Sequence, residues 1–174
     1  MKPIVYAVRA LPGGVPAEVA SRVELRGGDT RPAPRERIHA DARDAEILVV
    51  TYLDRVDDAL LDGLPGVRQV SSYGVGLNHV DLQATARRGL VVTNTPDVLT
   101  DATADMAMAL LLAAARRVCE GDRLIRAGGW CDAGPEFLLG REVTGKTLGI
   151  VGFGRIGQAM ARRAAGTSTG RGLV

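Results

Sequence analysis

Residues 147–160, TLGIVGFGRIGQAM, join an apolar run to a glycine-rich turn and the start of a helical pattern. Gly152, Gly154 and Gly157 have the spacing G-x-G-x-x-G. In a dinucleotide-binding fold the first glycine permits the tight turn, the second lets a pyrophosphate approach the backbone, and the third lets the helix pack close to the strand. The stretch therefore predicts the first βα unit of a Rossmann domain. A tight βα turn that binds nothing is the alternative.

In that unit the N–H groups of Arg155 and Ile156 would hold the pyrophosphate at the N-terminus of the helix. The fingerprint continues about 20 residues later with an acidic residue that binds the ribose hydroxyls. Residues 158–174 contain neither Asp nor Glu and show no second strand pattern. The cofactor can therefore be NAD or NADP. The end of the chain, TSTGRGLV (167–174), is predicted to be an unstructured tail, typical of a frameshift or cloning remnant, with a natural flexible C-terminus as the alternative.

Upstream of this turn, short apolar runs alternate with helical stretches. The predicted strands cover 3–8, 23–25, 46–51, 67–71 and 90–93, and the predicted helices cover 16–21, 35–42, 57–63 and 79–88. Strands that alternate with helices and are apolar on both faces indicate a parallel sheet covered on both sides. The sequence predicts an α/β fold with a small flavodoxin-like domain over residues 1–99.

A long helix is predicted next, from Thr100 or Asp101 to about residue 127, because either side chain can accept the free N–H groups of a first turn. A strand over 146–151 would then lead into the glycine-rich turn. We expect residues 100–166 to be the connecting helix and the start of an incomplete dinucleotide-binding domain. Because a lone strand leaves its backbone groups unsatisfied, residues 130–174 are predicted to be poorly ordered or to borrow a partner from another copy.

Composition excludes several classes of protein. The 174 residues carry a net charge of +2 with acids and bases mixed, which argues against binding to nucleic acid. Cys119 and Cys131 form no CxxC motif, so we expect no metal site and no disulfide, and a reducing compartment. The longest apolar run, 106–115, is too short to span a membrane. These features predict a cytoplasmic protein with no membrane partner.

Four segments together resemble the D-isomer-specific 2-hydroxyacid dehydrogenases, near the branch of glyoxylate and hydroxypyruvate reductases. They are residues 71–105, the helix MALLLAAARR (108–117), DRLIRAGGW (122–130) and GKTLGIVGFGRIGQAMARRAAG (145–166). The resemblance covers roughly residues 45–166. It implies a flavodoxin-like substrate domain that precedes the nucleotide-binding domain, with a long helix between them.

The resemblance also implies roles for individual residues. The loop of Gly74, Val75 and Gly76 would present backbone N–H groups to the carboxylate of the substrate, where an ordinary βα turn is the alternative. Tyr52 and Leu53 would face the substrate, and Thr103 would lie near the nicotinamide. Trp130 is interpreted as a packing residue.

The catalytic set of this family is an Arg that binds the ketoacid, a His that acts as acid and base, and a Glu that orients the His. None of these motifs occurs in the sequence, so we assign no catalytic residue and expect no turnover from this chain by itself. His79 is interpreted as a helix-start or packing residue and His39 as a surface residue. Arg155 belongs to the pyrophosphate loop and is not the substrate Arg.

The expected function is reduction of a small 2-ketoacid, such as glyoxylate or hydroxypyruvate, with NADH or NADPH, by a longer protein that forms a homodimer. The alternative is a non-catalytic protein that binds a small molecule or oligomerises through the helix at 101–127. An S-adenosylmethionine methyltransferase also has a glycine-rich βα turn. It ranks lower because it would not place a five-unit domain and a long helix before that turn.

Overall fold

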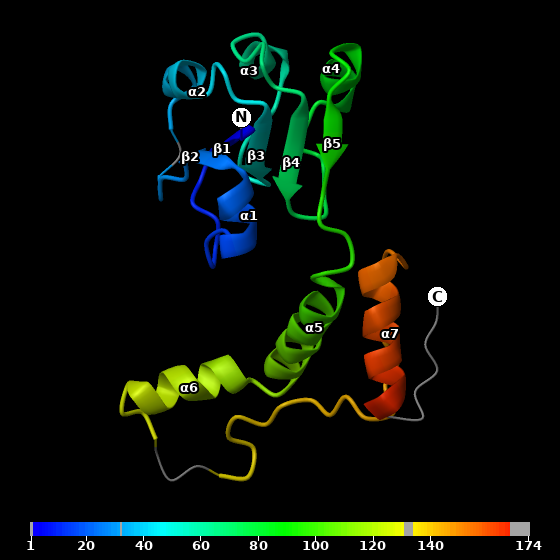
Figure 1. The fold of residues 1–174 in the computed structure, drawn as a ribbon. Coiled ribbons are helices and arrows are strands. Elements are labelled where there is room, and N and C mark those ends of the chain that lie inside the picture. The colour runs from blue at the N-terminus through cyan, green and yellow to red at the C-terminus, as the bar shows by residue number, and fades with distance from the viewer. Residues whose placement is uncertain (1, 32, 131–133, 168–174) are drawn as a thin grey trace. The chain divides into compact units, whose positions relative to one another are not determined.

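The computed structural model describes residues 2–31, 33–130 and 134–167 (Figure 1). The chain divides into two compact units, Met1–Pro96 and Asp97–Val174. The first unit contains the sheet, and the described residues of the second contain three helices. Of the tail predicted over 167–174, all but the first residue lies outside the described part of the chain.

The first unit is built on five parallel strands. They are β1 (Ile4–Ala7), β2 (Glu24–Gly27), β3 (Ile47–Thr51), β4 (Gln69–Tyr73) and β5 (Val91–Thr93). Their order across the sheet is β2-β1-β3-β4-β5, and all four neighbouring pairs are parallel. The α/β fold and the flavodoxin-like sheet expected from the sequence are confirmed, and the structure adds the order of the strands.

Four short helices connect the strands. They are α1 (Ala17–Arg22), α2 (Arg35–Asp41), α3 (Asp58–Leu61) and α4 (Leu82–Arg87). Helix α4 begins three residues later than predicted, because Val80 pairs with Val56 in an isolated bridge. The side chain of Asp81 then caps the helix by accepting from the N–H groups of its first turn.

The core lies around the two central strands. Leu48 and Val50 of β3 and Val70 of β4 are completely buried, as is Val56 in the segment after β3. Parallel strands are covered on both faces by their crossover helices. By contrast, the edge strand β2 has no buried residue, which explains why its sequence pattern is weak.

His39 is not a surface residue, contrary to the expectation from its charged neighbourhood. Its ring is half-buried and Nε2 lies 3.0 Å from the carbonyl oxygen of Leu60. A Cβ atom at Gly63 would overlap this ring, so the glycine makes room for it. The packing of α2 beside α3 therefore decides the position of His39.

The second unit contains α5 (Thr100–Ala115), α6 (Val118–Arg126) and α7 (Arg155–Thr167). The single helix predicted to residue 127 is wrong, because Arg117 has left-handed dihedral angles, φ 56° and ψ 32°. Its guanidinium donates two hydrogen bonds to Glu120, at 2.8 and 2.6 Å. The N–H of Arg141 donates to the carbonyl of Ala115 at 2.7 Å and so satisfies the end of α5.

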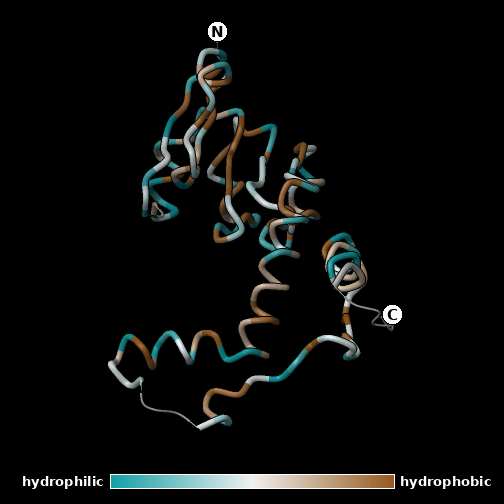
Figure 2. Tube along the Cα trace, turned by 90° about the horizontal axis from the view of Figure 1, so that it is seen from below, coloured by the Kyte–Doolittle hydropathy of each residue, from teal (hydrophilic) through white to brown (hydrophobic). Residues whose placement is uncertain are grey.

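Helices α5 and α7 pack on each other through small residues. Ala104 and Ala159 are completely buried, and Met160 is nearly so. Arg163 donates to Asp105 at 2.5 Å and to Asp101 at 3.2 Å. Hydrophobic residues also occur on the exposed sides of α5, whose tube is pale to brown along much of its length in Figure 2.

Residues 146–151, which were predicted to form a strand, are not part of any of the strands in the described part of the chain. A parallel strand needs neighbours to bond its N–H and C=O groups. The five-stranded sheet supplies none for this segment, which has a single bridge residue at Gly149. Of the apolar side chains expected to be exposed in this segment, Val151 is fully exposed, whereas Leu148 and Ile150 are half-buried. No helix among the described residues is both long and apolar enough to cross a membrane.

Candidate functional site

The loop after β4 carries the predicted carboxylate-binding residues. The carbonyl of Gly74 accepts a hydrogen bond from the N–H of Thr95 at 3.0 Å, and the carbonyl of Val75 accepts one from Nδ2 of Asn94 at 2.8 Å. A Cβ atom added to Gly74 or Gly76 would meet nothing within 4 Å. The backbone of this loop is therefore anchored from the chain after β5 and open above its glycines.

The predicted substrate-facing residues lie at the tip of a turn after β3. Tyr52 is 71% exposed and Leu53 is 61% exposed, whereas Thr51 and Asp54 on either side are buried. The N–H of Asp54 donates to the carbonyl of Thr51 at 3.0 Å, which closes the turn. The tight turn is the reason that two large apolar side chains point outward here.

The chain after β1 is joined to the same turn by an ion pair. Nε of Arg9 lies 2.5 Å from Oδ1 of Asp54, whose side chain is only 6% exposed. In a sheet of order β2-β1-β3-β4-β5 the connections reverse between β1 and β3, and the carboxyl ends of those strands are where such folds usually bind ligands. The ion pair between Arg9 and Asp54 therefore connects the segments that follow β1 and β3 at that edge of the sheet.

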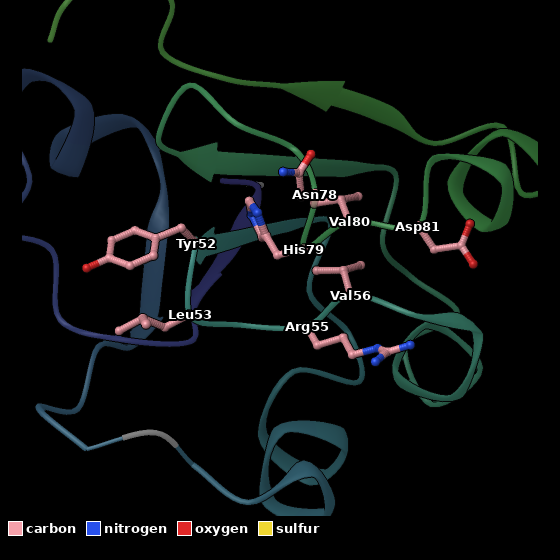
Figure 3. Close-up of a pocket in the computed structure, with 8 residues that line it drawn as sticks. All are labelled: Tyr52, Leu53, Arg55, Val56, Asn78, His79, Val80 and Asp81. Atoms are coloured by element: carbon pink, nitrogen blue, oxygen red, sulfur yellow. The ribbon is translucent and has the colours of Figure 1, made fainter. Parts of the chain in front are cut away.

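A shallow cavity of about 340 Å³ lies between the segments after β3 and β4 (Figure 3). Its lining residues are Tyr52, Leu53, Arg55, Val56, Asn78, His79, Val80 and Asp81. Tyr52 and Leu53 are among them, but the loop at 74–76 is not. Figure 3 shows the side chains of Tyr52 and Arg55 pointing in opposite directions, away from each other.

His79 is a hydrogen-bonding residue beside the loop, as the packing interpretation expected, and it does not begin a helix. Its Nε2 lies 3.1 Å from Oγ of the buried Ser72, and its carbonyl accepts from the N–H of Val56 at 2.9 Å. The imidazole therefore fixes the end of β4. This arrangement gives no independent support for a catalytic role.

The second unit carries the glycine-rich turn. The first hydrogen bond of α7 runs from the N–H of Gln158 to the carbonyl of Gly154 at 2.9 Å. The N–H groups of Arg155, Ile156 and Gly157 therefore lie in the first turn, where a helix has no acceptor of its own for them. The guanidinium of Arg155 forms an exposed ion pair with Asp97 at 3.2 Å.

Each glycine of this turn has the geometry that its expected role requires. Gly152 has φ +91°, a conformation that favours glycine. A Cβ atom at Gly157 would overlap the carbonyl oxygen of Gly152, whereas one at Gly154 would meet nothing within 4 Å. The turn therefore has a closely packed helix start and an open backbone at its centre. The residues present fit a pyrophosphate group.

Thr103 and Trp130 are both exposed. Thr103 lies in the first turn of α5, where its N–H donates to the carbonyl of Leu99 at 2.9 Å. Trp130 contacts Phe137 edge-to-face, with 6.1 Å between ring centroids. Within the described part of the chain, no group of three or more His, Cys, Asp or Glu side chains is placed to hold a metal ion. Cys131 lies outside that part, and Cys119 is an exposed free thiol.

Asn94 and Asp54 contact the candidate loops and were not among the residues singled out in the sequence. Both follow the carboxyl end of a predicted strand, which is where ligand-binding residues of parallel sheets gather. This position after a predicted strand is the sequence feature by which Asn94 and Asp54 could have been found. Their hydrogen-bond partners, however, can be identified only once the strands are arranged.

Comparison with known proteins places this geometry in a family. Residues 15–171 match the model for the D-isomer specific 2-hydroxyacid dehydrogenase, catalytic domain. Glyoxylate reductase of Pyrococcus furiosus is 47% identical over 172 residues, which cover 95% of this chain and 51% of that enzyme. The corresponding enzyme of Thermococcus kodakarensis is 46% identical over 171 residues, with the same coverage. The chain spans about half the length of the curated relatives it matches.

Solved structures agree. A protein from Thermus thermophilus matches with a TM-score of 0.90 and 42% identity, over 97% of this chain and 54% of its own. An NADPH-dependent glyoxylate/hydroxypyruvate reductase from Sinorhizobium meliloti, solved with NADP and malonate, matches with a TM-score of 0.78 and 31% identity, over 99% and 53%. With its parallel sheet and its glycine-rich turn, the chain belongs to the D-isomer specific 2-hydroxyacid dehydrogenase family.

Proposed function

We propose that this chain supplies the substrate-carboxylate loop and the pyrophosphate turn of an NAD(P)H-dependent reductase of small 2-ketoacids such as glyoxylate or hydroxypyruvate. The observation that carries the proposal is the loop at 74–76, which is anchored through its carbonyls and open above its glycines. The 47% identity to a glyoxylate reductase supports the assignment of this loop to substrate binding.

Backbone N–H groups suit the carboxylate of a 2-ketoacid because a hydrogen bond to an ionised acceptor is stronger than one between neutral groups. Val75 and Gly76 would supply these donors. Tyr52 and Leu53 on the neighbouring turn would contact the rest of the substrate, since they are the exposed apolar residues at that end of β3. The two loops follow adjacent strands, β3 and β4.

The turn at 152–157 would hold the pyrophosphate of NAD or NADP on the N–H groups of Arg155 and Ile156, with Gly154 leaving the backbone accessible. Thr103 would lie near the nicotinamide. When bound, the cofactor would supply a hydride for the carbonyl carbon of the ketoacid. The residues described here bind and orient the substrate and the cofactor.

Reduction of a carbonyl also needs a proton donor. We assign that role to no residue of this chain, because the catalytic motifs of the family do not occur in the sequence and the segment of His79 corresponds to a non-catalytic segment of the family. Purified chain mixed with NADH and glyoxylate should therefore show no oxidation of NADH. In the same sample, glyoxylate should shift the amide resonances of Val75 and Gly76. Steady turnover would contradict the first expectation, and unmoved resonances would contradict the proposed substrate site.

The alternative is a non-catalytic flavodoxin-like protein that binds a small molecule or oligomerises through the helix at 101–127. The ion pair between Arg9 and Asp54 lies at the carboxyl ends of β1 and β3, where such folds usually bind ligands, and so disfavours a small-molecule site there. The exposed apolar residues of α5, Met106, Leu110 and Leu112, support a contact with a second copy of the chain. We therefore propose a homodimer, which light scattering across a range of concentrations would test. The exposed free thiol of Cys119 supports a cytoplasmic location.

A further inference from the structure

Two consecutive peptide groups in the loop after β4 are held by two consecutive residues after β5. The N–H of Thr95 donates to the carbonyl of Gly74 at 3.0 Å, and Nδ2 of Asn94 donates to the carbonyl of Val75 at 2.8 Å. Both carbonyls therefore face the segment of Asn94 and Thr95.

The orientation of a carbonyl also sets the orientation of the N–H in the same peptide group. Peptide groups are planar, and in the trans form the N–H points opposite to the C=O. The described peptide bonds include no cis form. The N–H groups of Val75 and Gly76 therefore point away from Asn94 and Thr95, and within the described part of the chain neither donates to an acceptor.

The loop is also open beside its two glycines, because a Cβ atom at Gly74 or Gly76 would meet nothing within 4 Å. Two neighbouring N–H groups that both point away from this segment and have no acceptor among the described residues suit one carboxylate. Only one of the two anchors depends on a side chain. Thr95 donates through its backbone, whereas Asn94 donates through its amide nitrogen.

We propose that Asn94 is a positioning residue, whose side chain turns the N–H of Gly76 toward the carboxylate of the substrate. This inference rests on the proposed function and adds to it the residue that prepares the binding loop. With an Asp at position 94, a carboxylate oxygen would face the carbonyl of Val75, and repulsion would favour rotation of that peptide group. With an Ala, the anchor would be lost without repulsion.

The test uses the 174-residue chain with two variants, Asn94→Asp and Asn94→Ala. The control is Gln69→Glu, which also converts an amide to an acid. Gln69 lies at the start of β4, where its Nε2 donates to Oγ of Ser71 at 2.8 Å. Residual dipolar couplings give the direction of each N–H bond relative to the sheet. A titration with sodium glyoxylate, with glycolaldehyde as a probe that lacks the carboxylate, gives the affinity of the loop.

We expect both Asn94 variants to rotate the N–H vector of Gly76 while the couplings of β3 and β4 stay unchanged. The Kd for glyoxylate should rise about tenfold, because one of two charge-assisted hydrogen bonds is weakened. Gln69→Glu should leave the Gly76 vector and the Kd as in the parent chain, and glycolaldehyde should cause no shift in any protein.

An unchanged Gly76 vector in both variants would overturn the positioning role, whatever glyoxylate does. Loss of the sheet resonances in both would also overturn it, because Asn94 would then be needed for folding itself. If the vector rotates but glyoxylate shifts neither Val75 nor Gly76 in the parent chain, the carboxylate site and the proposed function fail. In that case the orienting effect of Asn94 on the loop stands.

Discussion

Asp54 accepts two hydrogen bonds from Thr51, one from its N–H and one from its hydroxyl, both at 2.9 Å to Oδ2. Its other oxygen accepts from Nε of Arg9 at 2.5 Å. The carboxylate is thus buried but fully engaged, and the turn that exposes Tyr52 and Leu53 is built around it. A buried charge of this kind is costly when it loses its partners.

Asp54→Ala should lower the free energy of unfolding by about 2–3 kcal/mol, because the N–H and hydroxyl of Thr51 and the guanidinium of Arg9 lose their acceptor. Urea unfolding followed by circular dichroism would measure this. The control is Asp44→Ala, which removes an exposed ion pair with Arg26 and should cost less than about 1 kcal/mol. An equal decrease in the free energy of unfolding in the two variants would show that the hydrogen bonds of Asp54 stabilise the fold no more than an exposed ion pair does.

Two carboxylates at the start of α3 should make the fold sensitive to acid. The hydrogen bond from Arg88 is the main cause that lowers the pKa of Asp58. Burial raises the pKa of Asp57, but hydrogen bonds from Arg35 and from the N–H of Leu60, together with the charges of Arg35 and Arg55, outweigh it and leave that pKa lowered. A carboxyl whose pKa is lower in the folded state stabilises the protein above its unfolded pKa, about 3.9.

The free energy of unfolding should therefore decrease as the pH falls below about 4 and through the lower folded pKa values. Asp57→Asn keeps a side chain that can cap α3 but removes the charge. We expect it to be about 1 kcal/mol less stable than the parent at pH 7, with a gap that closes below about pH 4. Asp122→Asn, in an exposed pair with Arg126, serves as the control. A gap that stays constant from neutral pH into strong acid would contradict the linkage.

The two glycines at the start of α7 should respond differently to a methyl group. Gly157→Ala places a Cβ atom against the carbonyl of Gly152 and should destabilise the second unit by about 1–3 kcal/mol. Gly154→Ala places it in open space, so the thermal midpoint should change little. Helix content and melting of both variants would be compared with the parent. Equal melting temperatures would show that the close approach at Gly157 is relieved at no cost.

Amide hydrogen exchange should separate residues 147–151 from the central strands. Leu48 and Val50 lie in β3, which is bonded on both sides, and their N–H groups should exchange slowly. The fully exposed Val151 and its neighbours belong to none of the five strands and have a single bridge residue at Gly149, so their N–H groups should exchange much faster. Slow exchange at 147–151 that persists on dilution would contradict this, whereas protection only at high concentration would indicate pairing between copies.

The alternation of strands and helices was predictable because each βα unit carries its own apolar run and its own caps. Asp57 and Asp81 cap the helices that follow them, within a few residues of themselves. The break at Arg117 was not predictable from helical periodicity, since the apolar pattern continues across it. The segment of Arg141 and Gly140, more than twenty residues later, approaches the end of α5 there and bonds its last carbonyl.

The sequence by itself determined the family, the glycine-rich turn and the loop at 74–76, because each depends on residue types at fixed short spacing. Only the tertiary structure decided the strand order and the contacts that position the loops. Arg9 reaches Asp54 across 45 residues, and Asn94 reaches Val75 across 19. Such partners are selected by which strands become neighbours in the sheet, and local patterns carry no information on that choice.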